Sequence, residues 1–126
     1  MPVLTQPPTP GDVLKFELNP NFNRETVTLL AGATYPVGAV LGRITASGLY
    51  KLATSGGSDG AQTAAAVLLD AVDASAADTP GLVILRGPAI VSKAALVLDP
   101  TVDDAAKTAT KHGQLAALGI VPRDTA

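Results

Sequence analysis

Four prolines within the first ten residues constrain this chain more than any other feature of its sequence. They stand at Pro2, Pro7, Pro8 and Pro10. Each proline fixes φ at about −65°, lacks a backbone N–H donor and confines the preceding residue to extended conformations. Neither a helix nor a central strand can run through such a segment. We predict an extended N-terminal arm over residues 1–18, followed by a single β-rich domain over residues 19–126.

The composition limits the core that this domain can build. The chain has 126 residues, the size of one domain, and 47% of them are hydrophobic. Aromatic residues make up only 3%, so leucine, valine, isoleucine and alanine must fill the interior. A core of such small side chains is thin, and a neighbouring subunit can supply the burial that it lacks. The composition therefore favours an oligomer.

Charge and cysteine content exclude several classes of protein. The net charge is −2 and the nine basic residues are scattered, whereas nucleic-acid binders usually carry a basic patch. The absence of cysteine excludes disulfides and zinc–cysteine sites. The longest apolar run, residues 64–69, is far shorter than the roughly 20 residues that span a bilayer. We expect no nucleic-acid partner, no membrane segment and, because no basic stretch precedes an apolar one at the N-terminus, no signal peptide.

Short runs of β-branched and apolar residues, separated by glycine and proline, predict a mainly β fold. The expected strands cover residues 25–30, 39–45, 49–53, 66–72, 82–86 and 89–91. Glycine-rich turns between them are typical of a small barrel. Residues 64–69 are ambiguous, because their alanine-rich run could equally nucleate a helix. Residues 15–18 alternate polar and apolar side chains, which indicates an extended segment laid against a surface.

The hydrophobic period changes near the C-terminus, where one or two short helices are expected. Asp99 can cap a helix that begins at Pro100, because proline fits where the first N–H has no partner. We expect this helix to break near residues 112–113, where glycine follows histidine. Gly119 then has the position of a left-handed helix end, with Ile120 packing back onto the helix.

No group of residues has the spacing of a catalytic or metal site. The single histidine, His112, is expected at a solvated helix end and has no cysteine to join it. Asp70 and Asp73 would face opposite sides of a strand, so they cannot share acid–base work. Residues 56–60 are rich in glycine but lack the Gly-Lys-Ser/Thr of a phosphate-binding loop. We predict that the protein is not an enzyme and binds no cofactor or metal.

Two binding functions remain as alternatives. Residues 31–44 share the glycine spacing of lipoyl- and biotinyl-carrier barrels, but the candidate acceptor Lys51 lies inside an expected strand instead of on a hairpin. A ligand- or glycan-binding β module usually exposes aromatic side chains, and this chain holds two tyrosines and two phenylalanines in all. A carrier would show a modified lysine, detected as a mass shift of the intact protein.

Seven short segments follow one another in an order that resembles a known family. They are NRETVTLLAG at residues 23–32, VGAVLGRIT at 37–45, GLYK at 48–51, SDG at 58–60, AAVLLDAVD at 65–73, VILR at 83–86 and LAALGIVPR at 115–123. This ordered set resembles the lambda-like phage head decoration protein D family over residues 14–123.

The resemblance implies a structural virion protein with a β-clip-like fold. It implies a homotrimer on the outer surface of an expanded, HK97-type icosahedral shell, at three-fold and quasi-three-fold sites. There it would bind the major capsid protein and stabilise the DNA-filled head, after synthesis in the host cytoplasm. In this family the N-terminal arm becomes ordered against the capsid protein, partly by adding a strand.

On this resemblance the arm is the capsid-binding segment. Its candidate contact residues are Pro2, Val3, Leu4, Pro7, Pro8, Pro10, Phe16 and Leu18. A strand added to a sheet edge binds through main-chain hydrogen bonds. A proline-rich segment loses little entropy on binding, because its free state is already extended. Residues 16–18 would then add the strand, and the prolines would reach further along the shell.

Overall fold

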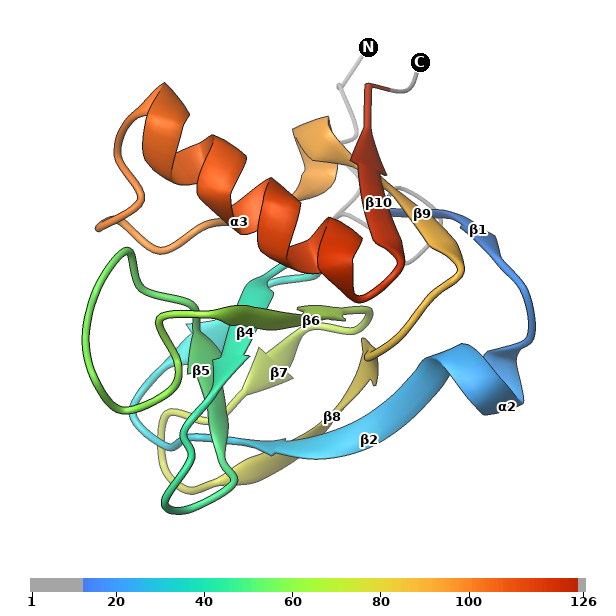
Figure 1. Cartoon of the computed structure of the whole chain (residues 1–126). Coiled ribbons are helices and arrows are strands. Elements are labelled where there is room, and N and C mark those ends of the chain that lie inside the picture. The colour runs from blue at the N-terminus through green and yellow to red at the C-terminus, as the bar shows by residue number, and fades with distance from the viewer. Residues whose placement is uncertain (1–12, 125–126) are drawn as a thin grey trace, which may run out of the picture.

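The structure, a computed structural model, describes residues 13–124 and has a mainly β fold (Figure 1). The strands are β1 (Leu14–Glu17), β2 (Arg24–Leu29), β3 (Thr34–Tyr35), β4 (Val40–Arg43), β5 (Tyr50–Leu52), β6 (Ala64–Leu68), β7 (Val72–Asp73), β8 (Thr79–Ile84), β9 (Ala89–Ser92) and β10 (Ile120–Arg123). The helices are α2 (Pro20–Asn23), the 3-10 helix η1 (Lys93–Ala95) and α3 (Ala105–Ala117). Within residues 13–124, no helix has the length and apolar character that crossing a bilayer requires.

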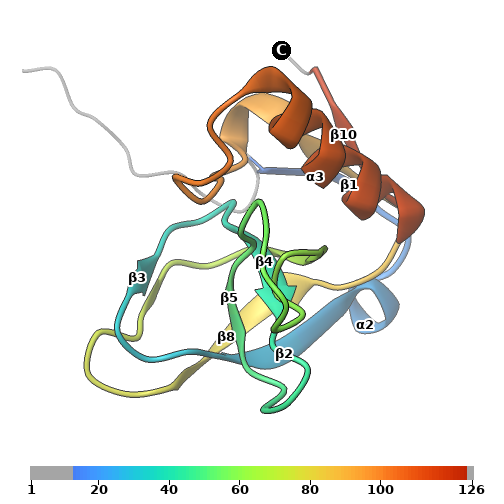
Figure 2. The same cartoon turned by 60° about the vertical axis from the view of Figure 1, so that its left-hand side comes forward.

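Five strands close into a small barrel in the order β2-β5-β4-β6-β8. Its longest antiparallel pair joins β2 to β8, from Arg24 opposite Ile84 to Leu29 opposite Thr79. β2 and β5 meet through a single pair, Leu29 with Tyr50, so the ring closes unevenly. Figure 2 shows α3 lying to one side of this barrel. The predicted mainly β class, with a barrel of short strands and small helices, is confirmed.

β6 is buried on both of its faces, and this explains its ambiguous sequence. Val67 belongs to a core cluster that includes Leu115 of α3. Its neighbour Leu68 belongs to a second cluster, with Leu29 and Leu41 of the barrel. A strand that is covered on both faces has a continuous apolar run instead of an alternating one. The strand interpretation of this segment is therefore the correct one.

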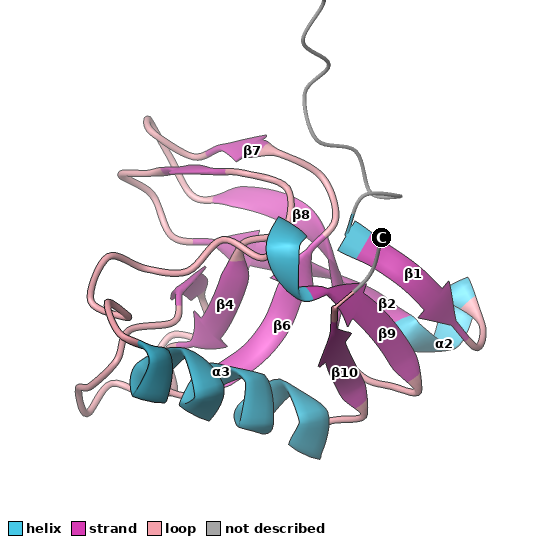
Figure 3. Cartoon of the chain, turned by 90° about the horizontal axis from the view of Figure 1, so that it is seen from above, coloured by secondary structure: helices cyan, strands magenta, loops and turns pink. Residues whose placement is uncertain are grey.

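A three-stranded sheet, ordered β1-β9-β10, lies beside the barrel (Figure 3). β9 pairs antiparallel with β1 and parallel with β10. α3 packs against β10 and β6, so it covers the core between this sheet and the barrel. Val91, Leu115 and Ile120 are completely buried there.

The prediction of a helix that begins at Pro100 is wrong. α3 begins later, with Asp104 as its N-cap, and the Asp104 carboxylate accepts a hydrogen bond from the Lys107 backbone N–H at 2.8 Å. Asp99 instead accepts hydrogen bonds from the backbone N–H and the hydroxyl of Thr101, at 3.0 and 2.6 Å. Aspartate favours helix caps and tight turns alike, and here Asp99 closes a turn.

The predicted break at residues 112–113 is also wrong, because α3 runs through both of them. Gly113 is exposed and faces open space. It therefore lowers the stability of the helix by only the roughly 1 kcal/mol, relative to alanine, that any glycine costs inside a helix. Lys111 and Leu115, which share the buried face of α3, hold the helix in place. His112 therefore lies half-buried within α3 and not at a solvated helix end.

The predicted left-handed end of the C-terminal helix is confirmed. Leu118 is the C-cap of α3, and Gly119 follows it with φ of +83°. Ile120 comes next, completely buried, as the first residue of β10. The chain therefore passes directly from the end of α3 into the three-stranded sheet.

Candidate functional site

The predicted capsid-binding residues divide between two parts of the chain. Six of them lie outside the described residues: Pro2, Val3, Leu4, Pro7, Pro8 and Pro10. Phe16 lies in β1 and Leu18 directly after it, with 48% and 63% of their surface exposed. Two large apolar side chains thus face solvent close to the point where residues 1–12 join the described structure.

β1 is part of the folded body of the molecule. Phe16 pairs with Ile90 of β9, and the Leu18 N–H donates to the Pro88 carbonyl at 3.3 Å. Val13, immediately before the strand, is completely buried in the core. Phe16 and Leu18 are therefore presented by a strand whose backbone is held in a sheet.

An ion pair fixes the end of β1 to the start of β2. The Arg24 guanidinium donates to both oxygens of Glu17, at 2.7 and 3.0 Å. Only 13% of the Glu17 side chain is exposed, so solvent screens this pair less than an ordinary surface pair. The two parallel hydrogen bonds also define the orientation of the two side chains.

Asn23, at the end of α2, is a buried polar residue with all of its hydrogen-bonding groups engaged. Its side-chain oxygen accepts from the Asn19 N–H at 2.8 Å. Its side-chain nitrogen donates to the carbonyls of Arg86 and Pro88, at 2.9 and 3.1 Å. These bonds tie the β1–α2 corner to the segment between β8 and β9. They set the position of β1 against β9.

The large exposed apolar residues of the described structure lie around β1, on a surface that we call the β1 corner. They are Phe16, Leu18, Phe22, Leu118 and Val121, each at least 40% exposed. Phe16 lies in β1, Leu18 directly after it and Phe22 in α2, while Leu118 caps the end of α3 and Val121 lies in β10. β1, β9 and β10 lie side by side (Figure 3). Concentrated exposed apolar surface marks an interaction site more often than scattered single residues do.

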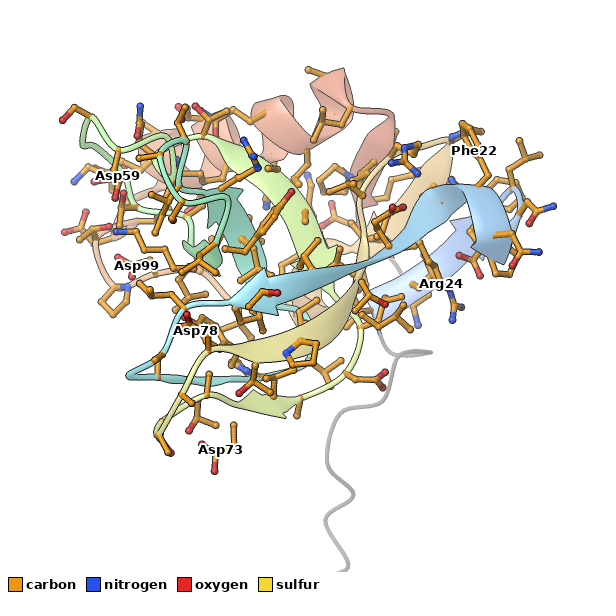
Figure 4. All side chains as sticks on the ribbon, turned by 90° about the horizontal axis from the view of Figure 1, so that it is seen from below. Phe22, Arg24, Asp59, Asp73, Asp78 and Asp99 are labelled. Atoms are coloured by element: carbon orange, nitrogen blue, oxygen red, sulfur yellow. The ribbon has the colours of Figure 1, made fainter. Side chains whose placement is uncertain are left out.

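Two arginines at this corner are paired with carboxylates. Arg86 donates to Glu25 at 3.4 Å, and its guanidinium lies 5.6 Å from the centre of the Phe22 ring. Arg24 is held by Glu17. Figure 4 shows Phe22 and Arg24 on one side of the molecule and the labelled aspartates on the other. A corner dominated by apolar side chains, with two of its arginines already bound to carboxylates, fits a protein surface better than a nucleic acid, whose phosphates need several unpaired cations.

The other sequence candidates have structural roles. Asp73 accepts hydrogen bonds from the backbone and hydroxyl of Ser75, which hold the pKa of its carboxyl below the usual value. Lys51 lies inside β5, as expected, and pairs with Asp59 at 2.8 Å beside a cavity of 310 Å³. Residues 13–124 contain no group of three or more His, Cys, Asp or Glu that could hold a metal.

Phe22, Leu118 and Val121 are exposed apolar residues outside the set predicted from the sequence. Val121 was missed because no strand was predicted over residues 120–123. The run Ile-Val-Pro after a left-handed glycine is the signal that could have indicated β10. Phe22 was missed because its segment has the composition of a turn, with a proline and two asparagines around it.

Comparison with known proteins places this fold in a family. No curated protein shows significant similarity to the chain. A family model described as bacteriophage lambda head decoration protein D matches residues 3–120, nearly the whole chain. Proteins of this kind are structural components of the phage head, carried on its capsid. The chain belongs to the bacteriophage lambda head decoration protein D family.

Proposed function

We propose that this head decoration protein is a homotrimer that binds the outer surface of the expanded capsid through its N-terminal arm. The sites are the three-fold and quasi-three-fold positions of an HK97-type shell, and the partner is the major capsid protein. Binding there stabilises the DNA-filled head. The protein is made in the host cytoplasm and acts in the virion without catalysis.

The exposure of Phe16 and Leu18 is the observation that carries this proposal. Both residues lie beside the entry of residues 1–12, and both leave apolar surface in water. Burying apolar surface gains about 25 cal/mol per Å². The arm therefore has apolar anchors at its folded end, and the sheet that carries β1 holds them in place before binding.

Few large anchors imply a weak contact for each arm, and three arms compensate. Once one arm of a trimer is bound, the second and third bind as intramolecular events. A loss of about 0.5–1 kcal/mol per arm becomes about 1.5–3 kcal/mol over three arms, which is roughly a 10- to 200-fold change in affinity.

Co-sedimentation with empty heads that lack this protein tests the proposal. The wild type, a form without residues 1–12 and Phe16→Ala are each titrated against expanded and unexpanded heads. We expect the truncated form to lose nearly all binding to expanded heads and Phe16→Ala to bind about 10- to 200-fold more weakly. The cut is placed before Val13, because Val13 and β1 belong to the core and the sheet.

Thr28→Ala is the matched control, since Thr28 is an exposed strand residue of the barrel, away from the β1 corner. We expect it to pellet as the wild type does. Unexpanded heads should bind all forms poorly. Equal pelleting of the wild type and the truncated form with expanded heads would reject the arm as the docking element.

A further inference from the structure

The register of the three-stranded sheet aligns three apolar residues across one face. Phe16 of β1 lies opposite Ile90 of β9, and Ile90 lies opposite Val121 of β10. Residues directly opposite one another in a sheet share a face. Alternate residues of β9 and β10, such as Val91 and Ile120, point to the other face and are completely buried.

A β-bulge in β1 puts Phe16 on the outer face. Leu14 and Phe16, two residues apart, would share a face in a regular strand. Here Leu14 pairs with Val91 and Phe16 with Ile90, which are adjacent on β9, and the register shifts between them. The extra residue of the bulge reverses the alternation. Leu14 therefore packs on the core and Phe16 faces outward.

The outer face remains open to solvent in the single chain. Phe16 is 48% and Val121 40% exposed, and Ile90 is half-buried between them. This stripe of Phe16, Ile90 and Val121, which we call the outer stripe, lies on a sheet whose inner face is closed by the core. Little ordering entropy is lost when a partner binds to a surface that is already held in shape.

We infer that the outer stripe is a second docking surface for the major capsid protein, which continues from Phe16 of the arm onto β9 and β10. This inference rests on the capsid binding proposed above and names a further part of the same contact. The partner surface would be apolar opposite the stripe itself, whose three side chains are hydrocarbon, and it would face the exposed Arg123 at the end of β10. Two nearby carboxylates are already paired, Glu17 with Arg24 and Glu25 with Arg86.

The position of the stripe in the chain favours the capsid as the partner that binds it. Residues 1–12 join the described structure at Val13, directly before β1. A shell surface that binds them therefore lies within a few residues of Phe16. A second copy of the chain is the alternative occupant, and the mass of the Val121 variants in solution distinguishes the two.

Two substitutions at Val121 test the inference in the full chain, by the same titration against expanded empty heads. Val121→Asp places a charge in the stripe, and we expect binding at least about 10-fold weaker. Val121→Thr keeps the β-branched shape that suits a strand, and we expect a loss of about threefold or more. Thr28→Asp, an equally drastic change on an exposed strand of the barrel, is the control and should bind as the wild type does.

Light scattering and thermal melting accompany each titration, and we expect wild-type mass and melting for Val121→Thr. Wild-type binding by both Val121 variants would overturn the inference, and the arm proposal would stand if removing residues 1–12 still abolished binding. Conversely, normal binding without residues 1–12 together with a loss in Val121→Asp would support the stripe and reject the arm. A folded but dissociated Val121→Asp would assign the stripe to contacts between copies and overturn the inference.

Discussion

At the scale of single residues, Lys111 is the least expected feature of the fold. Its side chain is almost completely buried in α3, at 1% exposure. The ammonium donates to the Gln62 carbonyl and to the side-chain oxygen of Gln114, which also accepts from the Ala64 N–H at 2.8 Å. A buried cation survives only with such partners. Lys111 thus ties α3 to the segment before β6, and its burial lowers the pKa of its ammonium.

This lowered pKa predicts a pH dependence of stability. Between the folded pKa and the usual 10.5, the unfolded chain binds more protons at Lys111 than the folded chain, so the free energy of unfolding rises with pH. That contribution is complete above pH 10.5 and is lost as pH falls through the folded value. We expect the stability of the wild type, relative to Lys111→Met, to increase as pH rises toward 10.5 in urea unfolding experiments.

Lys107→Met, on the same helix, is the control for this titration. Lys107 pairs with Asp103 at 2.8 Å, and this pairing raises the pKa of Lys107 above 10.5. Its contribution is therefore constant from neutral pH up to 10.5, where the Asp103 carboxyl stays ionised, and it falls at higher pH. Between neutral pH and 10.5 the difference in unfolding free energy between the wild type and Lys111→Met should change with pH, and the difference between the wild type and Lys107→Met should not. The same pH course for both differences would contradict a buried, destabilised ammonium at Lys111.

At the scale of elements, the junction of α3 and β10 determines where the outer stripe begins. The Gly87 N–H donates to the Leu118 carbonyl at 2.9 Å, and the Ala89 N–H donates to the Gly119 carbonyl at 3.0 Å. A Cβ added to Gly119 would lie 3.0 Å from the Gly87 Cα. The two glycines therefore pack backbone against backbone, and this contact brings β10 alongside β9.

Gly119→Ala is expected to destabilise the protein by about 1–2 kcal/mol. Alanine is strained at the φ of +83° and would also press on Gly87. Gly113→Ala is the paired comparison within α3, because a Cβ there meets open space. It should stabilise the helix by about 0.5–1 kcal/mol. Urea unfolding of both variants measures the two effects, and equal stability of Gly119→Ala and the wild type would contradict the left-handed turn.

At the scale of the whole molecule, the thin core is divided between two clusters on either side of the barrel wall. Neither contains phenylalanine, and both phenylalanines lie exposed at the β1 corner. The largest aromatic surface of this chain is thus placed for contact and not for folding. Exposed aromatic surface of this kind agrees with the proposed capsid contact at this corner.

Removal of residues 1–12 should leave the trimer intact. The ten described strands and both core clusters are built from residues 13–124, so we expect the truncated chain to keep its fold. We expect size-exclusion chromatography with light scattering to give a trimer mass for the truncated and the full-length protein, and thermal transitions within a few degrees of each other. A monomer after truncation would show that residues 1–12 serve the trimer and not the shell.

Local signals in the sequence were enough for the class of the fold and for several of its elements. β-branched runs between glycines predicted most of the barrel strands, and the left-handed turn at Gly119 could be read from its neighbours. These features depend on residues a few positions apart. The ordered segments also identified the family, whose match covers residues 3–120.

The candidate surface was decided by contacts between distant residues. Asn23 places β1 through carbonyls 63 and 65 positions away, and Lys111 is buried against Gln62, 49 positions away. The bulge that turns Phe16 outward exists only in the pairing with β9. Sequence alone determined that the chain is β-rich, poor in aromatic residues and rich in proline at its start. Only the tertiary structure decided which apolar side chains remain exposed, because exposure depends on which strands become neighbours.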